Sequence, residues 1–216
     1  MGAPEVELRR AWQSVVGEGS ALHHATTSSE LIDALLARHR EPHRRYHTAT
    51  HVMWVIRHLH TLEAAGQGPH DMAAAVLAAL YHDAVYDVRA NDNEARSAAL
   101  AVNTAHSLGW TDERCTLVHR LVMATAGHRP ADAEEAALVD ADLAILGAPP
   151  NKYAAYSSAV RAEYAHVSEA AWRAGRADAL RGFLATDHIY STAHMRQARG
   201  RRASANIAAE IAMLTS

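Results

Sequence analysis

One stretch constrains the fold more than any other: ten consecutive apolar residues, Met72 to Tyr81, lead directly into His82 and Asp83. A helix that is apolar on every side is stable only when other elements surround it, so this stretch predicts a central, buried helix. It is about half as long as a bilayer span, which needs roughly 20 residues. An ionisable pair at the end of a buried helix is costly unless something compensates it, as a bound cation would.

The rest of the chain also favours helices. Alanine is abundant and β-branched residues are sparse, and the 216 residues include only 11 glycines and 6 prolines. Hydrophobic residues make up 49% of the chain, which is enough for a sizeable core. There is no internal repeat or linker-like stretch. We therefore expect a single all-α domain over residues 1–216, a helical bundle of about nine or ten helices.

Apolar periodicity and capping residues predict where the helices lie. Ser28 and Ser29 are expected to cap the second helix and Asp71 the buried one, while Gly175 and Asp187 should mark breaks near the C-terminus. The four tryptophans, Trp12, Trp54, Trp110 and Trp172, are expected in the core. The predicted helices are 5–16, 31–40, 48–64, 72–82, 94–108, 111–124 and 133–145, with two or three more in 151–216.

Composition excludes several classes of protein. A single cysteine, Cys115, rules out an internal disulfide framework and fits a reducing compartment. The formal net charge of -3 gives no broad cationic surface for nucleic acid or membrane. The N-terminal residues lack the apolar core of a signal peptide. We therefore expect a soluble, cytoplasmic protein without nucleic-acid or membrane partners.

Two polar segments flank the buried helix and change the meaning of His82-Asp83. His47 and His51 are four residues apart, so on a helix they share one face. Downstream, Asp140 and Asp142 alternate with apolar residues, which suggests inward carboxylates. Histidine, His-Asp and a distant aspartate form a mixed nitrogen and oxygen donor set, which suits Mn, Fe, Zn, Mg or Ni. One metal site is expected, and a second is left open.

This order of residues resembles the H…HD…D signature of the HD superfamily, and more closely its branch of predicted metal-dependent HD phosphohydrolases. The stretches that carry the resemblance are RRYHTATHV, ALYHDAVYD, NDNEARSA, VDADLAILG, YAAYSSAVRAEY and FLATDHIY, which together span residues 44–190, roughly two thirds of the chain. The resemblance implies an HD-type helical bundle with its signature core in that range. It also implies hydrolysis of a phosphate ester by metal-activated water.

The resemblance assigns roles to individual residues. His51, His82 and Asp83 match the metal ligands, and the last ligand is Asp142, with Asp140 as the alternative. The two aspartates lie about 200° apart on a helix, so one metal is not expected to bind both directly. The Tyr46-His47-x-x-x-His51 segment is also similar to cyclic-nucleotide phosphodiesterases, which makes His47 a candidate general acid.

The remaining candidates are a proton acceptor and residues that bind substrate. Asp83 or Glu94 is expected to take the proton of the attacking water. Arg161, Tyr164 and His128 are candidate substrate-binding residues, because a guanidinium suits phosphate. The expected partner is a small phosphorylated molecule, with a nucleotide as one candidate. The apolar faces that carry Ile207, Ile211 and Leu214 would either pack internally or form a homodimer.

Two other functions compete with this hypothesis. The first is an HD-type di-iron oxygenase, which adds two histidines between the His-Asp pair and the last aspartate. His106 and His128 lie in that interval, although His106 is predicted near the end of its helix. The second is a non-catalytic protein that binds a small molecule on an HD scaffold. A fold alone does not decide among these functions.

Overall fold

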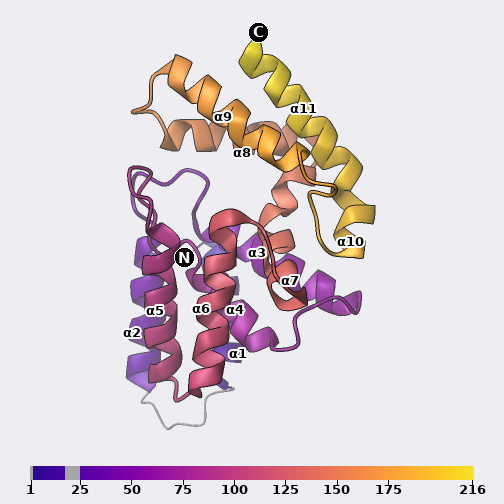
Figure 1. The fold of residues 1–216 in the computed structure, drawn as a ribbon. Helices are drawn as coiled ribbons and strands as arrows, with labels where there is room; N and C mark the ends of the chain where they lie inside the picture. The colour runs from indigo at the N-terminus through magenta and orange to yellow at the C-terminus, as the bar shows by residue number, and fades with distance from the viewer. Residues whose placement is uncertain (1, 18–24) are drawn as a thin grey trace.

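The computed structural model describes residues 2–17 and 25–216, and every regular element in these residues is helical (Figure 1). The expected all-α class is confirmed. Seven helices come first: α1 (Ala3–Gly17), α2 (Ala25–Arg38), α3 (Ala49–Ala64), α4 (Met72–Tyr81), α5 (Asn93–Ser107), α6 (Asp112–Gly127) and α7 (Ala133–Asp142). The 3-10 turn η1 (Leu143–Gly147) leads to α8 (Pro150–Glu163), α9 (Glu169–Leu184), α10 (Ala193–Met195), the π-helical turn η2 (Arg196–Gly200) and α11 (Arg201–Thr215).

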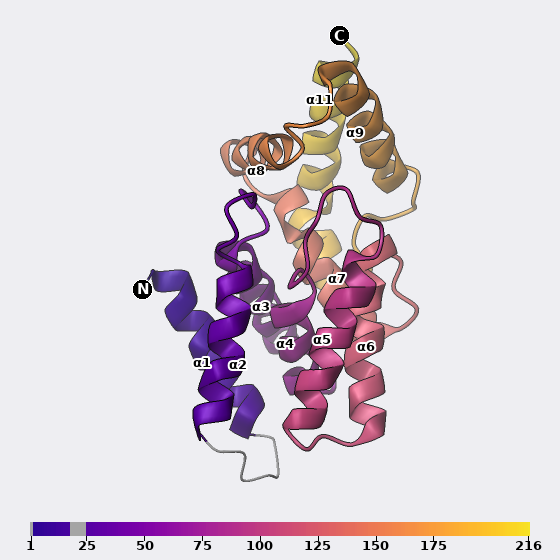
Figure 2. The same cartoon turned by 90° about the vertical axis from the view of Figure 1, so that its left-hand side faces the viewer.

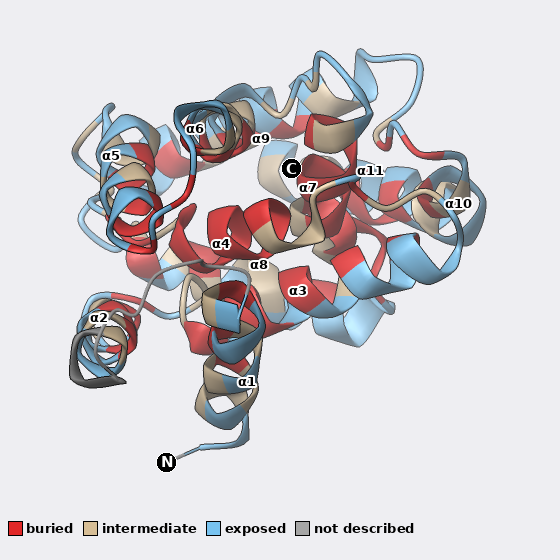
Figure 3. Cartoon of the chain, turned by 90° about the horizontal axis from the view of Figure 1, so that it is seen from below, coloured by how far each residue is buried: buried red, intermediate tan, exposed pale blue. Residues whose placement is uncertain are grey.

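Helix α4 lies at the centre of the first seven helices, as its apolar sequence predicts. Every residue from Ala74 to Tyr81 is buried, and α4 contacts α1, α3, α5, α6 and α7. Figure 3 shows its buried surface enclosed by helices whose outer faces are exposed. Small alanine side chains allow neighbours to approach α4 from all sides. Asp71 caps the helix by accepting a hydrogen bond from the backbone N–H of Ala74, as expected.

The C-terminal helices form a second group above the first (Figure 2). Helix α7 continues into η1, which packs against α11, and α11 packs against α9. Leu146, Tyr190 and Ile207 belong to the same hydrophobic core as α4. Ile207 is fully buried within the chain, and Ile211 and Leu214 pack against this core. Internal packing thus accounts for Ile207 fully and for Ile211 and Leu214 in part.

Three local expectations were wrong. Helix α2 begins at Ala25, so Ser28 and Ser29 lie inside it and do not cap it. Helix α9 runs through Gly175, because neighbouring residues favour a helix strongly enough to offset one exposed glycine. Trp54 is 49% exposed and does not belong to the core. The predicted break near Asp187 is present between α9 and α10.

Cys115 is buried and forms no disulfide. Among the described residues, no helix is both long enough and apolar enough to cross a bilayer.

The central position of α4 predicts a large effect of core truncation. Leu77→Ala should lower the free energy of unfolding by about 3–5 kcal/mol, because the side chain is fully buried. Leu184→Ala makes the same change at a position 39% exposed, and should cost about 0.5 kcal/mol or less. Urea denaturation followed by circular dichroism measures both. Similar losses for the two variants would contradict this packing.

Candidate metal centre

The end of α4 fixes the orientation of the His82 ring. The backbone N–H of His82 still bonds to the carbonyl of Ala78, and its ring Nδ1 lies 2.8 Å from the carbonyl oxygen of Ala79. A carbonyl only accepts, so Nδ1 carries the proton and Nε2 keeps a free lone pair. This tautomer is the one that allows Nε2 to bind a metal.

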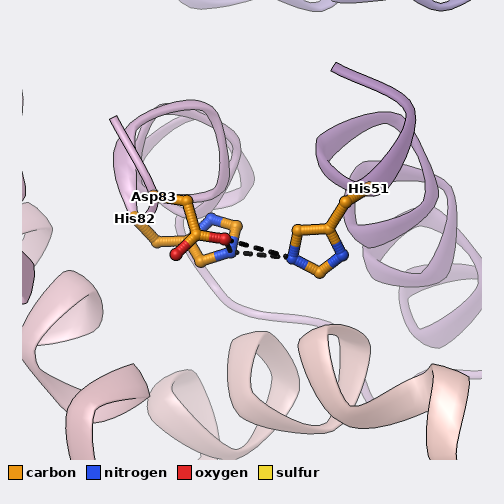
Figure 4. A group of neighbouring side chains, drawn as sticks. All are labelled: His51, His82 and Asp83. Atoms are coloured by element: carbon orange, nitrogen blue, oxygen red, sulfur yellow. Dashed lines mark hydrogen bonds and ion pairs between the residues drawn. The ribbon is translucent and has the colours of Figure 1, made fainter. Parts of the chain in front are cut away.

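Helix α3 presents His51 to the same point from the opposite side. His51 is buried in the first turn of α3, on the face that packs against α4. Its Nε2 lies 3.1 Å from Nε2 of His82 and 3.4 Å from Oδ2 of Asp83. Oδ2 of Asp83 lies 3.0 Å from Nε2 of His82. Figure 4 shows the three side chains converging from two helices, and together they could hold a metal ion.

Asp142 adds a fourth donor and Asp140 does not. Oδ1 of Asp142 lies 3.1 Å from Nε2 of His51 and 3.6 Å from Nε2 of His82. Asp140 points away, and its fully buried carboxylate accepts hydrogen bonds from both backbone N–H groups of Ser191 and Thr192. The geometry therefore favours Asp142 of the two. His51, His82, Asp83 and Asp142 are called the His–Asp cluster below.

The spacing of the cluster fits a cation. Donors about 2.1 Å from one ion stand roughly 3.0 Å apart in octahedral and 3.4 Å apart in tetrahedral geometry. The five donor–donor distances given above range from 3.0 to 3.6 Å. Two imidazole nitrogens that face each other at 3.1 Å do not attract each other when both are unprotonated lone pairs. A cation bound by both nitrogens, or a proton on one of them, removes this unfavourable contact.

The electrostatics of the cluster show how strongly its members interact. Burial by itself lowers the pKa of the His82 imidazole, but the Asp83 and Asp142 carboxylates outweigh burial and raise this pKa well above its usual value. Burial by itself raises the pKa of Asp83 and of Asp142, but the facing imidazoles hold both well below the usual carboxyl range. Opposite charges thus outweigh the desolvation of all three groups.

Arg44, which the sequence analysis did not single out, joins the two segments that carry the cluster. Its side chain is fully buried. Its guanidinium donates to the carbonyls of Asp83, Ala84 and His47 at 2.7, 3.2 and 3.0 Å. These bonds hold the chain after α4 against the chain before α3.

Glu163 is a second residue that the sequence analysis missed. Its Oε1 accepts hydrogen bonds from the backbone N–H groups of Arg45, Tyr46 and His47, at 2.7 to 3.1 Å. Its Oε2 accepts from Nδ1 of His47 at 2.8 Å and from the hydroxyl of Tyr86 at 2.9 Å. The one available signal was position, because Glu163 shares the buried face of α8 with Tyr153 and Val160.

These contacts place His47 beside the cluster. Its Nδ1 is held by Glu163, and its ring centre lies 5.7 Å from that of His51 and 4.2 Å from that of Tyr86. The ring is partly accessible, with 20% of the side chain exposed. His47 therefore stands at the edge of the cluster with Nε2 available for a proton.

His128 also reaches the cluster. It ends α6 in the left-handed conformation (φ 50°), an unusual one for a residue other than glycine. Its Nε2 lies 3.2 Å from Oδ2 of Asp142. The backbone turn thus directs the ring toward the aspartate that faces the cluster.

The other candidate residues lie elsewhere. Arg161 bonds to Glu169 and to carbonyls in the α8–α9 connection, and the Tyr164 ring packs on Trp172. Glu94 is half-buried in the first turn of α5, and none of the side-chain hydrogen bonds or ion pairs found among the described residues involves it. Neither Arg161, Tyr164 nor Glu94 lines the cavity beside the cluster.

That cavity, called the α3–α8 cavity below, has a volume of about 610 Å³. His51 and Asp142 form part of its wall, so the cluster is reached from it. Its remaining walls come from α3 and the segment before it, from η1 and α8, and from the side chain of Arg199. A volume in the range of 300–1,000 Å³ is typical of sites for small molecules.

Comparisons with protein-family models, curated proteins and solved structures found no match to this chain. The function must therefore be inferred from its own residues.

The contacts of Glu163 predict a pH-dependent contribution to stability. Glu163→Gln should lower the free energy of unfolding at pH 7 by about 2 kcal/mol, because the amide accepts hydrogen bonds with only one oxygen. His47 and the bonded backbone N–H groups outweigh burial and lower the pKa of Glu163 from 4.5 to about 2. The stabilisation is therefore complete above pH 4.5 and is lost as the pH falls toward 2.

Urea denaturation at several pH values tests this expectation. The difference between wild type and Glu163→Gln should shrink between pH 4.5 and pH 2. Glu169→Gln removes the same charge at a side chain that is 68% exposed, and serves as the control. A difference that stays constant over this pH range would contradict the assignment.

Proposed function

We propose that this protein is a metal-dependent phosphohydrolase of the HD type, which hydrolyses a phosphate ester with a divalent cation bound by His51, His82, Asp83 and Asp142. The observation that carries the proposal is the convergence of two imidazole nitrogens and two carboxylate oxygens at 3.0 to 3.6 Å, at the wall of a small-molecule cavity. Two imidazole donors favour a transition metal over Mg²⁺.

A cation held by His51, His82, Asp83 and Asp142 would supply Lewis-acid chemistry toward the phosphoryl group and the attacking water. The chain's own residues move the protons. Oδ1 of Asp83, which no donor among the described residues contacts, accepts the proton of the attacking water. His47 donates a proton from Nε2 to the leaving oxygen while its Nδ1 stays bonded to Glu163. The bond from phosphorus to the leaving oxygen breaks as the bond to the water oxygen forms, which gives an alcohol together with inorganic phosphate from a monoester or a phosphomonoester from a diester.

The di-iron oxygenase is less well supported. It needs two further histidine ligands between the His-Asp pair and Asp142, and of the two candidates only His128 contacts an acidic residue of the cluster. His106 lies at the α5–α6 turn, with Nδ1 3.6 Å from the sulfur of Cys115. The non-catalytic alternative is decided by the activity measurement described below.

Metal content should distinguish the two aspartates of α7. Asp142→Asn should weaken Mn²⁺ binding at least about tenfold, since it removes a charged donor. Asp140→Asn should leave Mn²⁺ binding intact but lower the free energy of unfolding by about 2 kcal/mol, because the carboxylate bonds to Ser191 and Thr192. Calorimetric titration with Mn²⁺ and thermal unfolding measure the two effects. The reverse pattern would make Asp140 the ligand.

Hydrolysis is tested with a panel of phosphomonoesters and phosphodiesters in the presence of Mn²⁺. We expect turnover that a chelator abolishes and Mn²⁺ restores. His82→Ala should lower kcat/KM at least about 100-fold, whereas His119→Ala, an exposed histidine on α6, should not. A wild-type protein that is silent on the whole panel, or a His82→Ala variant with full activity, would overturn the proposal.

A further inference from the structure

The α3–α8 cavity extends along one face of α3. His51, Trp54 and His58 all line it, and they follow one another at helical spacing on that face. Seven residues separate His51 from His58, which at 1.5 Å per residue is about 10 Å along the helix axis. The cavity therefore has one end at the His–Asp cluster and another about two helical turns away.

Arg199 occupies the far end. One guanidinium nitrogen lies 3.5 Å from Nε2 of His58, and the other donates to the carbonyls of Ala144 and Gly147 at 3.2 and 3.5 Å. Gly147 is required for this approach, because a Cβ there would lie 2.6 Å from the Cβ of Arg199. The turn η2 thus brings the arginine against η1 and holds it by neutral groups.

Among residues 2–17 and 25–216, no carboxylate forms an ion pair with Arg199, although its side chain is partly buried and its guanidinium contacts only neutral groups there. Burial and the charge of Arg199 lower the pKa of His58 to about 4, so His58 is neutral at pH 7. Arg45 and Lys152 line the same cavity, and Asp142 is the one carboxylate among its described lining residues. The cavity wall therefore favours anions away from the cluster as well as beside it.

Trp54 lines the middle of the cavity, between its two ends. Its ring stacks on His58 with centres 6.1 Å apart and planes 27° apart, and the Arg57 guanidinium lies 4.7 Å from the ring centre. Ile145 and Ala144 lie in the wall supplied by η1. An indole that is 49% exposed in a cavity wall offers a surface for a planar, apolar group.

We propose that the α3–α8 cavity binds an extended organic phosphate that carries a second anionic group, with the phosphate at the His–Asp cluster, a flat apolar spacer on Trp54 and the second anion on Arg199. This inference rests on the proposed phosphohydrolase function for the identity of the first group. The second site depends only on Arg199 and its surroundings, so binding tests it separately from hydrolysis.

The test uses two phosphonates, which a phosphatase does not hydrolyse: biphenyl-4-ylphosphonate, and the same molecule with a carboxylate at the far ring position. Calorimetric titration in the presence of Mn²⁺ should show that the carboxylate improves affinity about tenfold, as expected for one charge-assisted bond to arginine. Arg199→Met should abolish this preference. Arg201→Met, an exposed arginine that does not line the cavity, should preserve it.

Lys152→Met is a second variant, in case Arg199→Met fails to fold. Lys152 lines the same cavity but is exposed, so its replacement should not disturb folding. It should reduce the preference for the carboxylate by a smaller factor. Equal affinity of wild type for the two phosphonates, no binding of either, or an unchanged preference in Arg199→Met would overturn the inference. Preferential binding without turnover of any phosphate ester would refute the phosphohydrolase instead and leave the second anion site standing.

Discussion

The structure depends on how a buried group of ionisable side chains is compensated at the end of an apolar helix. Helix α4 is surrounded by five other helices, so the groups at its C-terminal end are mostly buried. Two imidazoles and two carboxylates meet there, carried by α3, by the end of α4 and by α7. The measured distances between their donor atoms are 3.0 to 3.6 Å. Each carboxylate offsets the desolvation of an imidazole, and removing one partner would leave a buried charge. The cluster therefore links the three helices at one point of the core.

Buried side chains outside the cluster hold its backbone in place. Arg44 bonds to carbonyls after α4, Glu163 to amides before α3, and Asp140 to amides before α10. In each case one charged side chain satisfies several main-chain groups of an irregular segment, which would otherwise be unpaired when buried. These bonds hold the irregular segments in place, and the bond from His47 to Glu163 positions its ring.

The parts that were predictable from sequence are those encoded by local pattern. Helix α4 followed from an unbroken apolar run, and the meeting of His51 with His82-Asp83 from their places beside it. Both Asp140 and Asp142 alternate with apolar residues, so only the family resemblance favoured Asp142. The structure separates them, because Asp142 lies within 3.6 Å of both imidazoles whereas Asp140 accepts from Ser191 and Thr192. Glu163 and Arg44 act on segments distant in sequence, so no local pattern marks them. Trp54 was expected in the core because it is a large aromatic residue on a predicted helix. Its exposure depends on which other helices cover it, and local sequence does not show that.

The two ends of the α3–α8 cavity have different origins in the chain. The cluster end is built by α3, α4 and α7, whose positions are set by the core around α4. The far end is built by η2, which meets His58 across 141 residues of sequence. A change at Arg199 or Gly147 therefore alters the far wall without touching any residue of the cluster. On this arrangement the chemistry of the site and its choice of ligand can change independently, because one depends on the core and the other on the C-terminal helices.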